Sequence, residues 1–337
     1  MRVRKLKLSV IVILSVLVIG GTFSFVQAEV SKMRLAVVGV LHPYFAPWEK
    51  ATKDFMEKTG IDCVYRATVH FNQEEENDIV EGLVSLGYNG FALWPGHPSA
   101  VNATITELVK KGIPVVLIAG PAELPTDASL CIATDVKKAA MIATEHLIEA
   151  LGGKGNIVNL LGALSDPNTV LRKQGVEEVV AKYPGVRIID ELADVDAWEA
   201  ATTKIDSLLA ARADEIDGMV ATNYIATVVA SEALVELGDK RIKFIGMDDD
   251  PKVLKAIKEG YVTGTMVQAP YAQAYLGLEA LRLLKSGYTV KKGVYFIDSG
   301  VTLVNANNVD TYAQDVHANF LKMLKTFTED YFNPPSS

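Results

Sequence analysis

Hydrophobic and polar positions divide most of the chain into short apolar runs and longer segments with apolar residues at helical spacing. The short runs are typical of buried strands, and the segments between them of helices that cover a sheet. This alternation predicts an α/β fold in which parallel sheets are flanked by helices. The predicted strands are 33–40, 61–67, 90–94, 114–119, 130–133, 157–161, 186–192, 218–221, 244–247, 261–267, 294–297 and 300–304.

The alternation occurs twice, before and after about residue 134, and 337 residues are enough to form two hydrophobic cores. Two such arrays predict two similar lobes.

One predicted helix, 73–86, has a strongly acidic outer face. The glycine cluster at 152–155 precedes a strand, so we interpret it as a helix end and turn rather than a phosphate-binding loop.

Three carboxylates directly follow one predicted strand. The apolar run 244–247 ends in Asp248, Asp249 and Asp250. Open α/β sheets bind ligands beyond the carboxyl ends of their strands, and carboxylates accept hydrogen bonds from ligand hydroxyls. Asp248, nearest the strand, is therefore a candidate ligand-binding residue. Asp249 and Asp250 could instead cap the following helix, and for Asp250 both interpretations stay open.

The first 28 residues have the features of a cleavable secretory signal. A basic start precedes an apolar run at 8–19 and a small-x-small pattern at 26–28. The run is short for a transmembrane helix, and no later run approaches that length. We therefore expect an exported protein that begins near Glu29.

Charge and cysteine content narrow the choice of partners. The formal charge is −8, and it becomes −12 when the four cations of the signal are left out. Such an acidic chain argues against nucleic acid or an anionic membrane as a partner. Cys63 and Cys131 lie in apolar strand-like runs that the topology places far apart, so we expect two buried thiols rather than a disulfide.

The sequence lacks the patterns of common catalytic and metal sites. It has no Gly-x-Ser-x-Gly elbow and no His-Glu-x-x-His pattern, and its five histidines lack metal-ligand spacing. An exported α/β enzyme stays an alternative, but we predict no catalytic residue, metal or cofactor. A ligand-responsive DNA-binding regulator would need a helix-turn-helix where the signal lies.

Seven motifs are similar to those of one family, in the same order. The chain after the signal resembles the type I periplasmic solute-binding proteins of ABC transporters, and within them the ribose-type sugar-binding branch. The motifs are Val37-Val38-Gly39 with Pro43-Tyr44-Phe45, Gly112-Ile113-Pro114-Val115-Val116, Ile132-Ala133-Thr134-Asp135, Asn168 with Arg172 and Gly175, Ala221-Thr222-Asn223, Gly246-Met247-Asp248, and Thr265-Met266-Val267-Gln268.

The resemblance implies two Rossmann-like lobes joined by a hinge of three segments near Thr134, Gln268 and Ser299. The N-terminal lobe would be 29–134 plus 269–298, and the C-terminal lobe 135–268 plus 299–337. A small polyhydroxylated ligand, a monosaccharide or sugar alcohol, would bind in the cleft between the lobes and be delivered to a membrane ABC permease. The protein would be periplasmic, with signal cleavage near Ala28.

The resemblance also implies which side chains hold the ligand. Sugars present apolar C–H faces and a rim of hydroxyls, which suit stacking aromatic rings and planar polar groups. By position in the motifs, the implied ligand-binding residues are Tyr44, Phe45, Asn168, Arg172, Asn223, Asp248 and Gln268, with Trp198 near another stacking position.

Structural alternatives accompany these assignments. Tyr44 and Phe45 could pack under their loop as a hydrophobic staple, and Asn223 could cap the following helix. Arg172 could be a solvated surface group, and Gln268 could satisfy only the backbone of the hinge.

The chain also departs from the ribose-type pattern. Ala119-Gly120 occupies the position of an Asp-Arg pair that grips the sugar, and Tyr224 stands where an aspartate is usual. We therefore expect a different monosaccharide, or a linear sugar alcohol held by His42, Trp94 and Glu123, although Trp94 could instead fill the core. A non-sugar ligand, or a chemoreceptor or other membrane sensor as partner, stays an alternative.

Overall fold

The computed structural model describes residues 33–335, so the expected signal and its cleavage position lie outside the described residues. The chain forms two compact units. Of the described residues, the first unit contains 33–132, 271–296 and 327–335, and the second contains 133–270 and 297–326. None of the helices between residues 33 and 335 combines the length and apolar content needed to cross a membrane.

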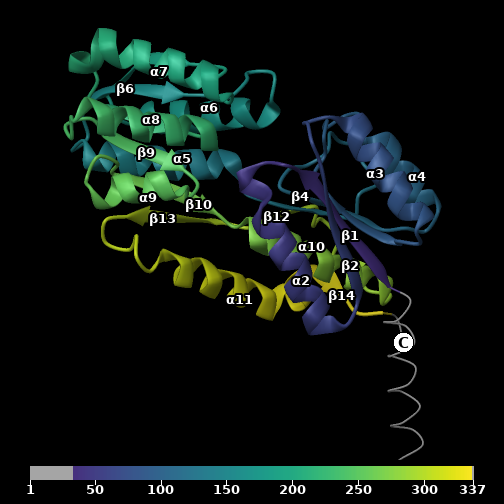
Figure 1. The fold of residues 1–337 in the computed structure, drawn as a ribbon. Helices are drawn as coiled ribbons and strands as arrows, with labels where there is room; N and C mark the ends of the chain where they lie inside the picture. The colour runs from purple at the N-terminus through teal and green to yellow at the C-terminus, as the bar shows by residue number, and fades with distance from the viewer. Residues whose placement is uncertain (1–32, 336–337) are drawn as a thin grey trace, which may run out of the picture. The chain divides into compact units, whose positions relative to one another are not determined.

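The first unit is built on a six-stranded sheet with the order β12-β5-β4-β3-β1-β2. β1 lies between β2 and β3 and is parallel to both, with Leu35 opposite Cys63 on one side and Gly90 on the other. Figure 1 shows α3 and α4 on one face of this sheet and α2 and α10 on the other. The strands are β1 (Arg34–Val40), β2 (Asp62–Thr68), β3 (Gly90–Leu93), β4 (Val115–Ile118), β5 (Cys131–Ala133) and β12 (Phe296–Asp298). The helices are η1 (Pro43–Phe45), α2 (Pro47–Thr59), α3 (Gln73–Ser85), α4 (Val101–Lys110) and α10 (Pro270–Lys285).

The second unit repeats this plan with the strand order β13-β10-β9-β8-β6-β7. Its last strand departs from the predicted parallel sheet, because β13 pairs antiparallel with β10. The strands are β6 (Gly155–Leu160), β7 (Val186–Leu192), β8 (Gly218–Ala221), β9 (Lys243–Met247), β10 (Gly264–Gln268) and β13 (Val301–Asn305). The helices are α5 (Val136–Ala150), α6 (Pro167–Val180), α7 (Trp198–Arg212), η2 (Ala213–Glu215), α8 (Tyr224–Leu237), α9 (Pro251–Lys258) and α11 (Tyr312–Tyr331), whose residues from 327 onward group with the first unit.

The strands of the second unit are apolar at successive positions because both faces of the sheet are covered. Phe244 packs in a core with residues of α7, α8 and α9, whereas the next residue, Ile245, packs in another core with residues of α5 and α6. Met219 and Val220 divide between the same two cores. Successive side chains of a strand point to opposite faces, so a strand covered on both sides needs a continuous apolar run.

The lobes expected from the resemblance and the two units differ at the C-terminal end. Residues 327–335 group with the first unit, although the resemblance assigns 299–337 to the second lobe. The reason is a short antiparallel pair in which β14 (Phe332–Asn333) lies against β11 (Thr289–Val290). Phe327 and Phe332 are both buried, and their rings are in contact.

The two cysteines are free and buried, as predicted. Cys63 lies in β2 and Cys131 in β5, and three strands separate them in the sheet order. Burial raises the pKa of both thiols, that of Cys63 to about 12.

Candidate functional site

Asp248 lies at the carboxyl end of β9 in the second unit and is only 7% exposed. Its φ angle of 72° is in the left-handed region, which aspartate tolerates better than most side chains. Two hydrogen bonds hold this backbone: the Asp248 N–H donates to the Met266 carbonyl (2.9 Å), and the Thr265 hydroxyl donates to the Asp248 carbonyl (2.7 Å). The turn therefore places a carboxyl group at the strand end in a defined position.

The carboxyl group of Asp248 is paired with a buried amide. The Gln268 Nε2, at the end of the adjacent strand β10, donates to Asp248 Oδ1 at 2.9 Å. Burial raises the pKa of Asp248 to about 7, while the Gln268 hydrogen bond and the charge of Arg172 act in the opposite direction. A carboxyl group with a pKa near neutrality can accept a hydrogen bond when ionised and donate one when protonated.

Asn223 adds a buried donor at the end of the next strand, β8. Its Oδ1 accepts a hydrogen bond from the Ala226 N–H (2.8 Å) and so caps α8, in agreement with the capping alternative. Its Nδ2 is buried and has no hydrogen-bond partner among residues 33–335, and the same holds for the Thr222 hydroxyl. A buried polar atom without a partner is unfavourable, so this amide is suited to donate to a ligand atom.

The other candidates of the second unit differ in their relation to Asp248. Arg172 is half-buried on α6, and its charge acts on the Asp248 carboxyl group. Asn168 lies one turn earlier, with its backbone N–H bonded to Asp166 Oδ1 at 3.0 Å. Trp198 begins α7 and is 50% exposed. Within the described part of the chain, the side chains of Asn168 and Trp198 make no hydrogen bond or ring contact with Asp248, Gln268 or Asn223.

In the first unit, the structure brings His42 and Trp94 together with two phenylalanines. We call His42, Phe45, Phe71 and Trp94 the aromatic cluster. Phe45 is 4% exposed and packs against Trp94, with ring centroids 5.6 Å apart. Phe45 therefore forms the buried base of the cluster. This agrees with the alternative in which Phe45 packs under its loop.

His42 and Tyr44 have defined partners at the end of β1. His42 Nδ1 accepts a hydrogen bond from the Tyr44 N–H (3.2 Å), and burial lowers the pKa of His42. The imidazole is therefore held in its neutral form. The Tyr44 hydroxyl donates to Oε1 of Gln273, a fully buried residue of α10, at 2.9 Å.

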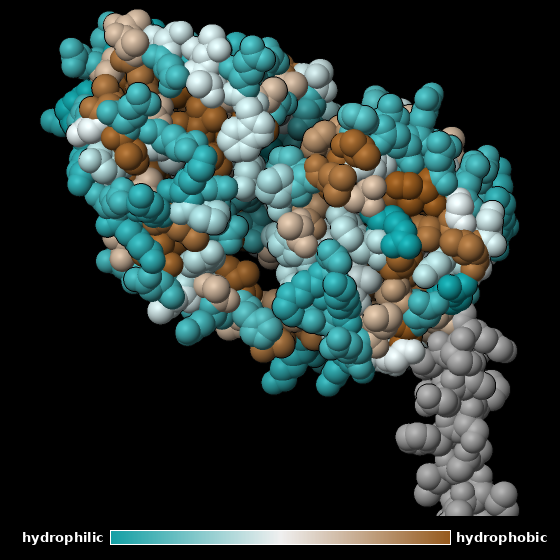
Figure 2. Space-filling model, viewed as in Figure 1, coloured by the Kyte–Doolittle hydropathy of each residue, from teal (hydrophilic) through white to brown (hydrophobic). Residues whose placement is uncertain are grey.

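Sequence reasoning did not select Phe71. This residue follows β2, is 61% exposed, and contacts the rings of Trp94 at 5.3 Å and His42 at 6.0 Å. Its position just after a predicted strand could have identified it as a candidate, because ligand-binding residues of α/β sheets occur there. Figure 2 shows hydrophobic side chains reaching the surface of the first unit among hydrophilic ones.

Glu123 is not part of this arrangement. Its side chain is exposed, its N–H donates to the Pro98 carbonyl (2.9 Å), and its own carbonyl accepts from Asn102 Nδ2 (2.8 Å). No contact joins its carboxylate to the aromatic cluster within residues 33–335. Of the three residues expected to hold a sugar alcohol, the structure therefore links His42 and Trp94, through Phe71, but not Glu123.

Over the same residues, no group of three or more histidine, cysteine, aspartate or glutamate side chains is placed to hold a metal ion. The run Asp248 to Asp250 instead has protein partners. The Tyr312 hydroxyl donates to Asp249 (2.9 Å), the Tyr224 hydroxyl donates to Asp250 (2.6 Å), and Asp250 also caps α9.

Comparison with known proteins agrees with this architecture. The model of the Periplasmic binding protein domain matches residues 35–289. The chain belongs to the periplasmic binding protein family. The membership confirms the resemblance found in the motifs and the expected type I fold. As a member, the chain is a solute-binding component of transport rather than an enzyme.

Relatives of this periplasmic binding protein include a xylitol-binding protein of Mycolicibacterium smegmatis, 28% identical over 252 residues that cover 74% of this chain and 70% of the relative. A D-apiose import binding protein of Paraburkholderia graminis is 23% identical and covers 87% and 96% of the two chains. Among solved structures, an ABC transporter solute-binding protein of Burkholderia graminis in complex with D-arabinose is 25% identical, with a TM-score of 0.75 over 84% of this chain and 98% of that one.

Proposed function

We propose that this protein is the solute-binding component of an ABC importer and binds a monosaccharide or a sugar alcohol. The observation that carries the proposal is the buried Asp248–Gln268 pair, together with Asn223 Nδ2 at the neighbouring strand end, which has no hydrogen-bond partner within residues 33–335. Ligand hydroxyls both donate and accept, so they match a carboxyl group and an amide donor placed side by side.

The relatives support the same class of ligand. Xylitol, D-apiose and D-arabinose, named for three of them, are uncharged and polyhydroxylated. The aromatic cluster of the first unit suits such ligands, because aromatic rings pack against the C–H faces between hydroxyls. We therefore assign ligand contact to His42 and Trp94 in that unit, alongside Arg172 and Asp248 in the second.

The proposed transport role also implies where the protein acts and which membrane proteins it contacts. We infer that the signal at 1–28 directs export to the periplasm, and N-terminal sequencing of the mature protein tests cleavage near Ala28. Ligand-driven closure of the lobes, which the resemblance implies, is tested by small-angle scattering with and without ligand. The permease is the expected partner, and a pull-down from membranes would also detect a sensor.

Thermal-shift screening of the protein from Glu29 onward tests the proposed function. The panel contains xylitol, D-arabinose, D-apiose, D-ribose, hexoses and sugar acids. A ligand that binds only the folded state stabilises it by about 2.7 kcal/mol at a hundredfold excess over its Kd. We expect at least one uncharged sugar or polyol to raise the melting temperature.

Two variants locate the site. Asp248→Asn should lose most of the shift, because it removes the buried carboxylate. The matched control is Asp249→Asn, an adjacent and exposed acid, which should keep the shift. A folded wild-type protein that responds to no sugar or polyol would contradict the proposed function.

A further inference from the structure

We infer that Phe71 is a further ligand-contacting residue, which packs on a C–H face of the sugar or polyol and is held in place by Glu75. The inference rests on the proposed function. A single exposed apolar side chain is common on protein surfaces and by itself means little. The contacts of Phe71 and the hydrogen bonds of its loop are the observations that give it a role.

The ring of Phe71 belongs to the same cluster as two proposed site residues. It meets Trp94 edge to face, with centroids 5.3 Å apart and an interplanar angle of 80°, and it meets His42 at 66°. Two perpendicular rings form a corner with apolar walls. Such a corner accepts the C–H side of a saturated carbon chain or ring, while the neutral His42 beside it offers a polar edge.

Phe71 also occupies the position in the fold where ligands bind. It follows β2, which pairs with β1, and the residues after β1 carry His42. The loops after β1 and β2 are joined by a hydrogen bond from the Leu41 N–H to the Thr68 carbonyl (2.9 Å). The carboxyl ends of parallel strands lie at one edge of the sheet, so these loops present their side chains at the same edge.

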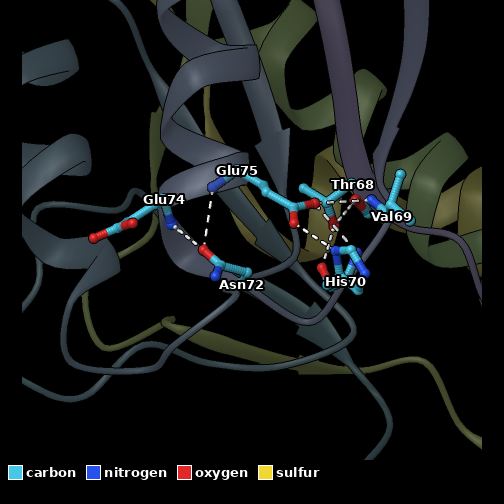
Figure 3. Close-up of polar contacts among 7 residues, drawn as sticks. Thr68, Val69, His70, Asn72, Glu74 and Glu75 are labelled. Carbon is cyan, nitrogen blue, oxygen red and sulfur yellow. Dashed lines mark hydrogen bonds and ion pairs between the residues drawn. The ribbon is translucent and has the colours of Figure 1, made fainter.

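The loop that carries Phe71 is fixed on both sides (Figure 3). Glu75 Oε2 accepts hydrogen bonds from the Val69 N–H (3.0 Å) and the His70 N–H (3.2 Å), and Glu75 Oε1 lies 2.6 Å from His70 Nδ1. On the other side, Asn72 Oδ1 accepts from the N–H groups of Glu74 (2.7 Å) and Glu75 (3.2 Å) and caps α3. We name this set of bonds the Glu75 staple.

The Glu75 staple gives the exposed Phe71 ring a role in binding, because packing alone does not explain why an exposed ring is held in place. An exposed phenylalanine on an unrestrained loop would lose conformational freedom when a ligand bound to it. A loop that is already fixed avoids most of this loss, and pre-organisation of this kind increases affinity. Glu75 is therefore a positioning residue that acts on the ligand through Phe71.

Calorimetric titration with xylitol, D-arabinose and D-apiose tests the inference on the wild type and five variants. Phe71→Ala should weaken binding about tenfold, the effect of losing one aromatic contact. Leu86→Ala is the matched control, since Leu86 is 65% exposed at the opposite end of α3, and its affinity should equal that of the wild type. Because Phe71 is exposed, we expect Phe71→Ala to fold.

The Glu75 variants test the positioning role. Glu75→Ala should weaken binding about threefold, whereas Glu75→Gln, which keeps an acceptor for the loop N–H groups, should restore most of the affinity. The double variant Phe71→Ala/Glu75→Ala should bind no more weakly than Phe71→Ala, because effects transmitted through one residue are not additive.

The outcomes separate the inference from the proposed function. Wild-type binding that is unchanged in Phe71→Ala overturns the inference and leaves the proposed function standing. Additive losses in the double variant overturn the positioning role of Glu75. Absence of wild-type binding to every sugar and polyol overturns the proposed function and this inference together.

Discussion

Glu76 is a buried acid that should make the stability of this protein depend on pH. The side chain lies on α3 and is 2% exposed. Its Oε2 accepts a hydrogen bond from the Gly96 N–H at 2.6 Å, two residues after Trp94 in the chain, while Oε1 is buried without a partner among residues 33–335. Burial raises the pKa of Glu76 from its ordinary value of 4.5 to about 8. The folded protein therefore favours the protonated acid.

The sign and size of the effect follow from this difference in pKa. A group whose pKa is higher in the folded state stabilises the fold below its unfolded pKa, and this stability is lost as pH rises through the folded pKa. At about 1.4 kcal/mol per pKa unit, the full loss for Glu76 is about 5 kcal/mol, of which about 4 kcal/mol falls between pH 5 and pH 9. Glu76→Gln cannot ionise, so its free energy of unfolding should lack this decrease.

Urea unfolding at pH 5 and pH 9, followed by tryptophan fluorescence, measures the effect. Trp48 and Trp94 lie in the same unit as Glu76, so two of the three tryptophans report on that unit, and Trp198 reports on the second. Glu74→Gln is the matched control, because it removes an exposed acid from the first turn of the same helix and should follow the wild type. If Glu76→Gln and the wild type lose equal free energy between pH 5 and pH 9, the reasoning is refuted.

Three further predictions concern the second unit and the cysteines. The affinity for the best sugar or polyol, measured by calorimetry, should rise between pH 6 and pH 8 as Asp248 ionises. In Asp248→Asn the affinity should be low and independent of pH. A wild-type affinity that does not change with pH would contradict this prediction. Gly246→Ala should destabilise the protein by about 1–3 kcal/mol, because its Cβ would lie 2.3 Å from Thr227 Cγ2, and an unchanged melting temperature would exclude that clash. Cys63 and Cys131 should react with a thiol reagent only after unfolding in urea, and reaction in the native state would show that they are accessible.

The fold could be predicted because its pattern is strong and repeated. Runs such as Phe244–Met247 are apolar at every position, and only strands covered on both faces require this. Boundaries were less certain. The predicted strand 261–267 begins at Gly264, because the N–H groups of Tyr261 and Val262 bond to the Ala256 carbonyl in the turn that ends α9.

The first-unit part of the candidate site was harder to predict than the second. The predicted helix 73–86 was expected to have a strongly acidic outer face, but one of its acids, Glu76, is buried, because the turn at Gly96 covers it. Helical periodicity places residues on a face, but it does not reveal which loop will cover that face. Phe71 presented the converse difficulty, since a single aromatic residue in a polar loop has no periodicity, and its contacts with Trp94 and His42 come only from the tertiary structure.

The two sheets reveal how the first unit departs from the ribose-type pattern. β4 and β9 occupy the same place in their strand orders, and each is followed by a residue with left-handed backbone, Ala119 with φ 62° and Asp248 with φ 72°. The two backbones are held alike, since the Ala119 N–H donates to Ile132 (3.0 Å) as the Asp248 N–H donates to Met266 (2.9 Å). A left-handed alanine is unfavourable by about 1 kcal/mol, and its side chain offers no hydrogen bond in return. The turn at Ala119 therefore has a backbone geometry like that of the turn that presents the Asp248 carboxylate, but it carries no carboxylate. We expect polar recognition to rest mainly on the second unit and apolar recognition on the aromatic cluster.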